Sequence, residues 1–250
     1  MTLLAAVLAV LIGVTLGLLG GGGSILTVPV FVYVLGIESK RAIAMSLPVV
    51  GLAALVGVAR HARLGNIDLR TALLFGLAAM AGAYGGARLA QFLLGPVQLA
   101  LFALVMLAAA VSMLRNAKLP EDTDAAQRAS WGKLAPIGLG VGMVTGLVGA
   151  GGGFLIVPAL VLLGHVPMRQ AIGTSLLVIS MNTAAGFAGY WNAVDIDWVL
   201  IVSFALLAGI GIMGGAALVH RVPTAQLKRG FAVLLILVGA SILWQILSLL

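Results

Sequence analysis

Long runs of apolar residues, separated by short polar stretches, follow one another along the whole chain. An α-helix needs roughly 17 to 25 apolar residues to cross a bilayer, and runs of this kind recur from end to end. The pattern predicts an all-α fold, that of a polytopic integral membrane protein. The expected apolar segments are 3–19, 25–36, 42–60, 69–94, 97–114, 134–149, 153–164, 171–190, 198–219 and 230–250.

One polar stretch, RNAKLPEDTDAAQRASWGK, interrupts this pattern from Arg115 to Lys133. It holds three of the seven acidic residues of the chain and a proline, which is typical of a loop. It predicts an N-terminal membrane repeat over 1–114, a polar linker loop over 115–133 and a C-terminal membrane repeat over 134–250.

The two halves carry the same motif in the same register. The stretch LLGGGGSILTVP (Leu18 to Pro29) returns as LVGAGGGFLIVP (Leu147 to Pro158), at an offset of 129 residues. The same ungapped offset places Asp68 on Asp197. Composition bias does not align a proline and an aspartate in one register, so the sequence indicates an internal duplication.

The length of segments 25–36 and 153–164 determines how the two repeats are oriented. Twelve helical residues reach only about 18 Å, too short to cross a hydrocarbon core of about 30 Å. If each short segment returns beside the long one before it, as a broken or re-entrant helix, three crossings remain in each half. An odd number of crossings gives inverted repeats. The alternative is a four-plus-four arrangement, in which each short segment merges with a neighbour.

Charge supports the inverted arrangement. The chain is 62% hydrophobic and 8% charged, with a formal net charge of +7. Inverted repeats place three basic residues, Lys40, Arg41 and Arg88, on one side and eleven on the other, as the positive-inside rule requires with both termini outside. The eleven are Arg60, Arg63, Arg70, Arg115, Lys118, Arg128, Lys133, Arg169, Arg221, Lys228 and Arg229.

The sequence holds no arrangement typical of an enzyme or of a cofactor site. There is no cysteine, and no pair of carboxylates lies within a membrane segment. The G-x-G-x-x-G match at Gly209 to Gly214 lies inside an apolar run, where glycines favour close helix packing over dinucleotide binding. His61, His165 and His220 lie at segment ends and are expected to be interfacial. We therefore expect no enzyme activity, no cofactor and no metal.

The paired glycine stretches are the candidate binding site. Irregular backbone at membrane depth is tolerated where it is buried in protein or lines a cavity, and paired breaks in two repeats point to a transporter's site. Glycine backbone and the N-termini of the short helices would bind an anion. The alternatives are tight helix contacts for the glycines and bonds to their own backbone for the hydroxyls. The candidates are Gly20, Gly21, Gly22, Gly23, Ser24, Ser46, Gly149, Gly151, Gly152, Gly153, Thr174, Ser175 and Asn182.

Four charged residues at segment ends come in corresponding pairs. Lys40 and Arg169 are equivalent at the offset of 129 and are predicted to form a basic collar at each entrance, unless they are snorkelling interfacial residues. Asp68 and Asp197 precede corresponding helices and are predicted to cap them.

These motifs resemble the sulfite exporter TauE/SafE family. The resemblance rests on the two L-x-G-x-G-G-x-x-L-x-V-P stretches, on AIAMSL and AIGTSL after them, and on a later G-x-x-G-G-A in each half. Ala150 departs from the glycine pattern, and the first half lacks the Gly-Thr of the second. The second half is therefore expected to hold more of the polar contacts.

The resemblance implies a transporter that exports sulfite or organosulfonates across the bacterial inner membrane by alternating access. Its partners would be a small anion and the lipid bilayer, with a homo-oligomer left open. No loop is long enough for a nucleic-acid face. An uptake permease for another small anion or metabolite and a non-transporting membrane subunit are the alternatives.

Overall fold

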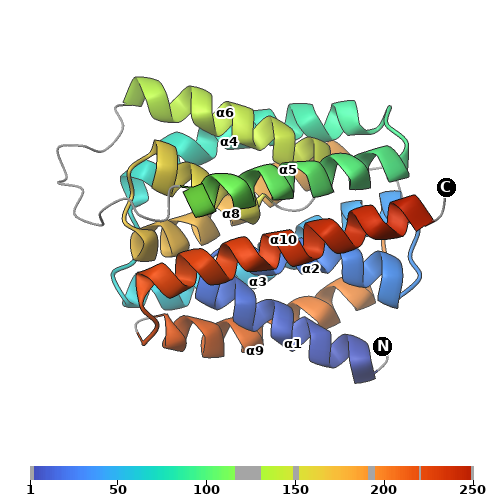
Figure 1. Cartoon of the computed structure of the whole chain (residues 1–250), viewed down its shortest axis with the longest axis horizontal. Coiled ribbons are helices and arrows are strands. Elements are labelled where there is room, and N and C mark those ends of the chain that lie inside the picture. The colour runs from blue at the N-terminus through green and yellow to red at the C-terminus, as the bar shows by residue number, and fades with distance from the viewer. Residues whose placement is uncertain (1–2, 116–130, 149–151, 191–194, 220, 249–250) are drawn as a thin grey trace.

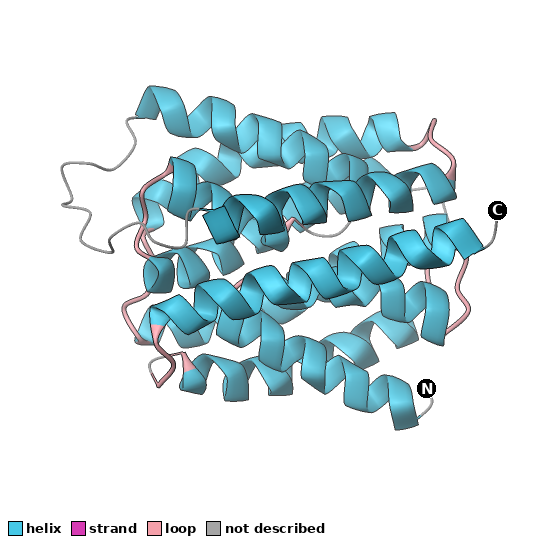
Figure 2. Ribbon diagram, viewed as in Figure 1, coloured by secondary structure: helices cyan, strands magenta, loops and turns pink. Residues whose placement is uncertain are grey.

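The computed structural model describes residues 3–115, 131–148, 152–190, 195–219 and 221–248, and these form a bundle of helices (Figures 1 and 2). No strand occurs within these ranges. The elements are α1 (Leu3–Leu19), α2 (Gly22–Pro29), η1 (Val30–Val34), α3 (Ser39–Arg63), α4 (Leu69–Ala90), α5 (Gly95–Arg115), α6 (Trp131–Val148), α7 (Gly153–Pro158), η3 (Ala159–Leu163), α8 (Met168–Tyr190), α9 (Trp198–Leu218) and α10 (Thr224–Ser248).

The long helices confirm the predicted polytopic membrane fold. In the described part of the chain, six helices are long and apolar enough to cross a membrane: α3, α4 and α5 in the first half, and α8, α9 and α10 in the second. In Figure 1, α1 begins and α10 ends at one end of the bundle, and the loops 64–68 and 164–167 lie at the other. The predicted linker 115–133 falls mostly outside the described residues.

The two short helices are built alike. Each runs as an α-helix to a proline, Pro29 or Pro158, and then continues as one turn of π-helix. Proline lacks an N–H and its ring crowds the carbonyl four residues earlier, which favours the wider turn. Accordingly, the N–H groups of Leu35 and Gly164 bond five residues back, to Val30 and Ala159. The π-helical turns were not predicted, and α2 begins three residues before the expected segment.

Two pairs of helices pack closely through glycine. α1 packs on α9, and α6 packs on α4. A Cβ added at Gly13 of α1 would overlap the carbonyl oxygen of Ala208, and one at Gly142 of α6 would overlap that of Ala79. The predicted packing role of the Gly209–Gly214 stretch is confirmed at Gly211, which lies against the backbone of Val10. Bare backbone at these positions lets the helices approach closely.

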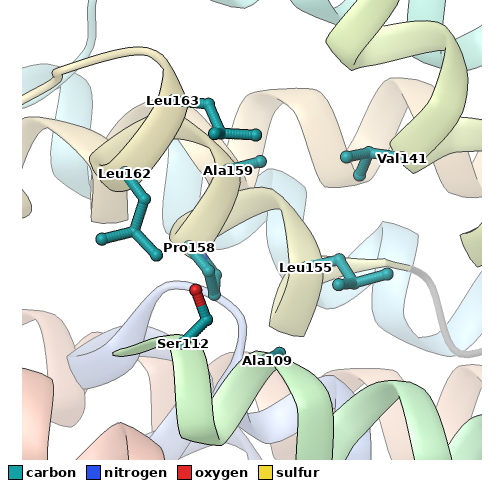
Figure 3. A pocket seen from close by; sticks show the side chains of 8 residues that line it. All are labelled: Ala109, Ser112, Val141, Leu155, Pro158, Ala159, Leu162 and Leu163. Atoms are coloured by element: carbon teal, nitrogen blue, oxygen red, sulfur yellow. The ribbon is translucent and has the colours of Figure 1, made fainter. Parts of the chain in front are cut away.

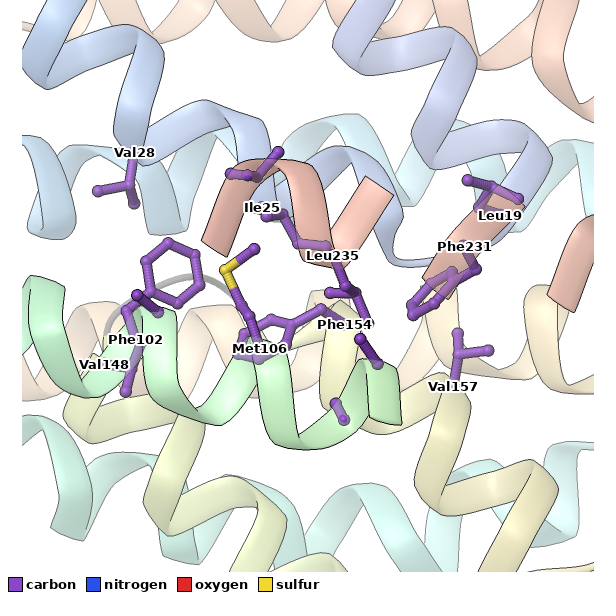
Figure 4. Packing of buried hydrophobic residues seen from close by; sticks show 14 of the residues in the cluster. Leu19, Ile25, Val28, Phe102, Met106, Val148, Phe154, Val157, Phe231 and Leu235 are labelled. Carbon is purple, nitrogen blue, oxygen red and sulfur yellow. The ribbon is translucent and has the colours of Figure 1, made fainter. Parts of the chain in front are cut away.

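A buried apolar cluster holds the two short helices against α5 and α10 (Figure 4). Ile25 and Val28 of α2 and Phe154 of α7 pack with Phe102 and Leu235. The rings of Phe102 and Phe154 meet edge to face, with their centroids 5.3 Å apart. The short helices are therefore enclosed within the bundle.

Both predicted helix caps are confirmed. Asp197 Oδ1 accepts a hydrogen bond from the N–H of Leu200 at 3.0 Å. Asp68 accepts two, from the N–H and the hydroxyl of Thr71 at 3.1 and 2.8 Å. Each carboxylate thus satisfies an otherwise unpaired donor in the first turn of its helix.

Removal of either cap should lower the free energy of unfolding, and the loss should be larger for Asp68 than for Asp197. Asp197→Ala is expected to lower the free energy of unfolding by about 0.5–2 kcal/mol, the usual effect of an N-cap. Asp68→Ala should cost more, because its carboxylate accepts a second hydrogen bond. Denaturant unfolding in detergent micelles measures both, and an equal or larger loss for Asp197→Ala would contradict this account.

Candidate functional site

The two glycine turns meet inside the bundle. Gly20 and Gly152 have positive φ angles of 72° and 78°, which side chains rarely adopt. The next residue of the first turn, Gly21, lies directly against Gly153, and a Cβ on Gly21 would overlap the Gly153 carbonyl. Both turns are buried in their described parts. Two breaks 129 residues apart in the sequence thus form one contact, at the N-termini of α2 and α7.

Helix geometry leaves backbone donors at this contact. The first N–H groups of a helix have no intrahelical partner and carry the positive end of its dipole. In α2 these groups belong to Gly22 and Gly23, both buried. The Ser24 hydroxyl donates to the Gly21 carbonyl at 2.7 Å. Gly149 and Gly151, also predicted for this site, lie outside the described residues.

The predicted hydroxyl residues of α3 and α8 make three different kinds of contact. Ser175 Oγ lies 2.9 Å from the Gly20 carbonyl and 2.8 Å from the Ile172 carbonyl of its own helix, so the two carbonyls share its one proton and α8 contacts the first glycine turn. Ser46 Oγ donates to the Ile43 carbonyl of its own helix at 2.7 Å. Thr174 lies instead beside the loop 64–68, where its hydroxyl oxygen accepts the Asp68 N–H at 2.9 Å.

Asn182 is connected to the second glycine turn through Thr145, a residue that was not predicted for the site. Its Nδ2 donates to Thr145 Oγ1 at 2.8 Å, and Thr145 packs directly on Gly152. Asn182 Oδ1 is buried and has no hydrogen-bond partner. The equivalent residues of the first half, Leu16 and Ala53, are apolar. A threonine inside an apolar run, matched by leucine in the other repeat, was the available signal.

The two predicted entrance residues lie at opposite ends of the bundle, at the starts of α3 and α8 (Figure 1). Lys40 Nζ donates to the carbonyl of Gln91, the C-cap residue directly after α4, at 2.7 Å. A cation is favourable there, because the last carbonyls of a helix are unpaired. Arg169 is partly buried, and its Nε has no hydrogen-bond partner.

The expectation that the histidines are interfacial is wrong for His61. This side chain is fully buried in the last turn of α3, and its Nε2 lies 3.1 Å from the Gly17 carbonyl oxygen. Position in the sequence suggested the surface, but α1 and the loop 64–68 cover the ring. His165 is exposed, and His220 lies outside the described residues.

An apolar pocket of about 340 Å³ adjoins the second short helix (Figure 3). It lies between α5, α6 and the α7–η3 segment. Its polar lining side chain is Ser112 of α5, and the remaining lining residues are Ala109, Val141, Leu155, Pro158, Ala159, Leu162 and Leu163.

The buried polar side chains are almost all neutral. Within the described ranges they include no carboxylate, and no group of three or more histidine, aspartate or glutamate residues could hold a metal. The set is Ser24, Thr27, Ser46, His61, Asn66, Thr71, Gln98, Thr145, Thr174, Ser175, Asn182 and Thr183. Such an interior offers hydrogen bonds without negative charge.

Comparison with known proteins agrees with this architecture. The family model for the sulfite exporter TauE/SafE matches residues 5–242. The chain belongs to the TauE/SafE sulfite exporter family. It is therefore a multi-pass membrane transporter, which confirms the expectation that it is not an enzyme.

Curated relatives of this TauE/SafE protein carry a transporter name. A probable membrane transporter protein of Xylella fastidiosa (strain 9a5c) is 32% identical over 242 residues, covering 94% of this chain and 92% of the relative. A probable membrane transporter protein of Bacillus subtilis (strain 168), YdhB, is 27% identical over 87% of this chain and 90% of the relative. No solved structure matches the chain.

Proposed function

We propose that this TauE/SafE protein exports small anions, sulfite or organosulfonates, through a site at the two glycine turns. The observation that carries the proposal is the direct contact between Gly21 and Gly153 deep in the bundle. This contact brings the N-termini of α2 and α7 together. Two helix N-termini with bare glycine backbone are suited to an oxyanion.

The surrounding charge favours an anion. The buried side chains within the described ranges supply hydroxyl, amide and imidazole groups and no carboxylate. A monoanion leaving an inside-negative cell gains about 2.3 kcal/mol per 100 mV of membrane potential. Export at modest gradients thus needs no other driving force. The excess of basic residues on the side of the linker 115–133 favours an orientation in the inner membrane with that side facing the cytoplasm.

Inverted repeats would supply the mechanism. Adding 129 to each residue number of the first half maps α1 onto α6 and α4 onto α9, so the contact of α1 with α9 is equivalent to that of α6 with α4. In the same way, the contact of Gly13 with Ala208 is equivalent to that of Gly142 with Ala79. α2 packs on α7 and α5 on α10, each with its own equivalent. These exchanges support two halves related by a pseudo-two-fold axis. Rocking of one half against the other would expose the shared site to each side in turn.

Transport in vesicles of known orientation tests the function. Proteoliposomes would be loaded with sulfite, methanesulfonate, sulfate or lactate. Efflux would be measured under an imposed membrane potential that is negative inside the vesicles. We expect protein-dependent efflux of sulfite or methanesulfonate that exceeds efflux of lactate. Accumulation against this potential would favour the uptake permease, and absence of flux for every sulfur anion would overturn the proposal.

A further inference from the structure

His61 is a buried titratable side chain that the proposed anion site does not use. It lies in the last turn of α3, at the end of the bundle that carries the loops 64–68 and 164–167. Its ring is enclosed between α1 and the loop 64–68: Nε2 lies 3.1 Å from the Gly17 carbonyl oxygen, and Nδ1 lies 3.5 Å from Asn66 Nδ2.

These contacts define which nitrogen carries the proton. A carbonyl oxygen can only accept, so Nε2 is the N–H donor to Gly17. In the neutral ring Nδ1 is then an acceptor and faces the amide nitrogen of Asn66, a donor. A proton added at Nδ1 would place two donors opposite each other. Asn66 would have to rotate and present its oxygen instead.

His61 is connected to the first glycine turn through two neighbouring residues, Gly17 and Asn66. On α1, Gly17 lies three residues before Gly20, whose N–H bonds to the Leu16 carbonyl in the last turn of that helix. On the other side, the Asn66 carbonyl packs so closely on Gly173 of α8 that a Cβ there would overlap it. Two residues further along α8, Ser175 contacts the Gly20 carbonyl.

The equivalent residue of the second half makes the same contact without a group that titrates near neutral pH. Tyr190 occupies the position of His61 at the offset of 129, and its hydroxyl donates to the Gly146 carbonyl at 3.3 Å. Gly146 is the equivalent of Gly17. The hydrogen bond to this glycine is thus common to both halves, and the imidazole is specific to the first half.

We propose that His61 binds a proton at Nδ1 from the side of the basic loops and that this proton strengthens anion binding at the glycine turns. The inference rests on the proposed anion site. The imidazolium would lie about one helical turn from Gly20, where its charge attracts an anion in a poorly hydrated interior. By linkage, a bound anion would strengthen proton binding by the same factor.

Other charged groups could contribute to a pH dependence and have to be separated from His61. Asp68 of the neighbouring loop has both carboxylate oxygens bonded to Thr71. The remaining ionisable side chains on α3, on the start of α4 and on the elements packed against α3 are Lys40, Arg41, Arg60, Arg63, Tyr33, Arg70, Arg115, Arg169 and Tyr190. Aspartate, lysine, arginine and tyrosine ordinarily have pKa values outside the range from pH 5.5 to 7.5, whereas histidine titrates within it. The variant His61→Gln therefore separates the contribution of His61 from theirs.

The first experiment measures proton binding to His61 in the absence of any substrate. The double variant His165→Asn/His220→Asn retains His61 as its single histidine. Its imidazole NMR signal is expected to titrate between pH 5 and 8, together with faster amide exchange in residues 64–68 at the acidic end. An imidazole signal that does not move across this range overturns the proton site, whatever the protein transports.

The second experiment reads the coupling. Binding of methanesulfonate, whose charge is constant in this range, is measured at pH 5.5 and 7.5 for the wild type, His61→Gln and the control His165→Asn. We expect about tenfold tighter binding at pH 5.5 in the wild type and the control, a typical coupling factor, and a ratio near one in His61→Gln. An unchanged ratio in His61→Gln overturns the coupling. If the wild type binds neither methanesulfonate nor sulfite, the proposed function is wrong. The NMR titration would still show whether His61 binds a proton.

Discussion

Alanine at Gly21 or Gly153 is expected to lower anion flux in proteoliposomes by more than tenfold. A methyl group on Gly21 would overlap the Gly153 carbonyl, and one on Gly153 would lie 2.6 Å from Gly21 Cα and from Ile179 Cδ1. Atoms do not approach so closely, so the two turns would have to separate. The two helix N-termini would then no longer converge on one anion. Initial rates of sulfite or methanesulfonate efflux measure the effect.

Gly85 and Gly214 provide the matched control. They occupy equivalent positions of the two halves, and a Cβ at either meets no atom within 4 Å. Alanine there should leave flux within about twofold of the wild type, since little crowding results. Size-exclusion profiles in detergent would show whether each variant is folded. Full flux from a folded Gly21→Ala/Gly153→Ala protein would reduce the glycine turns to a packing contact.

The glycine stretches show what the sequence could and could not predict. Their repetition and the short helices after them were visible as a pattern, because register and length are properties of the chain itself. From the sequence alone, helix packing and anion binding were alternative roles for these glycines. In the structure the close packing of Gly21 on Gly153 is what brings the two helix N-termini together. The close packing of these glycines therefore creates the arrangement of helix N-termini on which the proposed anion site rests.

Contacts between side chains on different helices of the bundle could not be predicted from the sequence. The caps Asp68 and Asp197 were predictable because a cap bonds within three residues of itself. The burial of His61 depends on Gly17, which is 44 residues away, and no local pattern signals that distance. Thr145 was missed for a related reason: its role depends on Asn182 and on the fold of the second turn.

Gly142→Ala tests the contact between the two halves. Gly142 of α6 is buried against α4, where an added Cβ would overlap the Ala79 carbonyl. Because neither helix can yield without losing contacts along its length, we expect a loss of about 1–3 kcal/mol in the free energy of unfolding, as for other overpacked interiors. Gly13→Ala, its equivalent against Ala208, should show a loss of similar size. Thermal unfolding in detergent, calibrated by denaturant titration, measures both.

The control for this contact lies two residues away on the same helix. Gly140 is exposed, and a Cβ there meets no atom within 4 Å, so Gly140→Ala should be neutral or slightly stabilising through higher helix propensity. If Gly142→Ala and Gly140→Ala unfold alike, the close approach of α6 and α4 is not what stabilises the bundle. If Gly142→Ala and Gly13→Ala are both destabilised while Gly140→Ala is not, the two halves hold each other through equivalent glycine contacts. A rocking motion would then have to pivot on these two helix pairs rather than separate them, because separation would break the close glycine contacts between the halves.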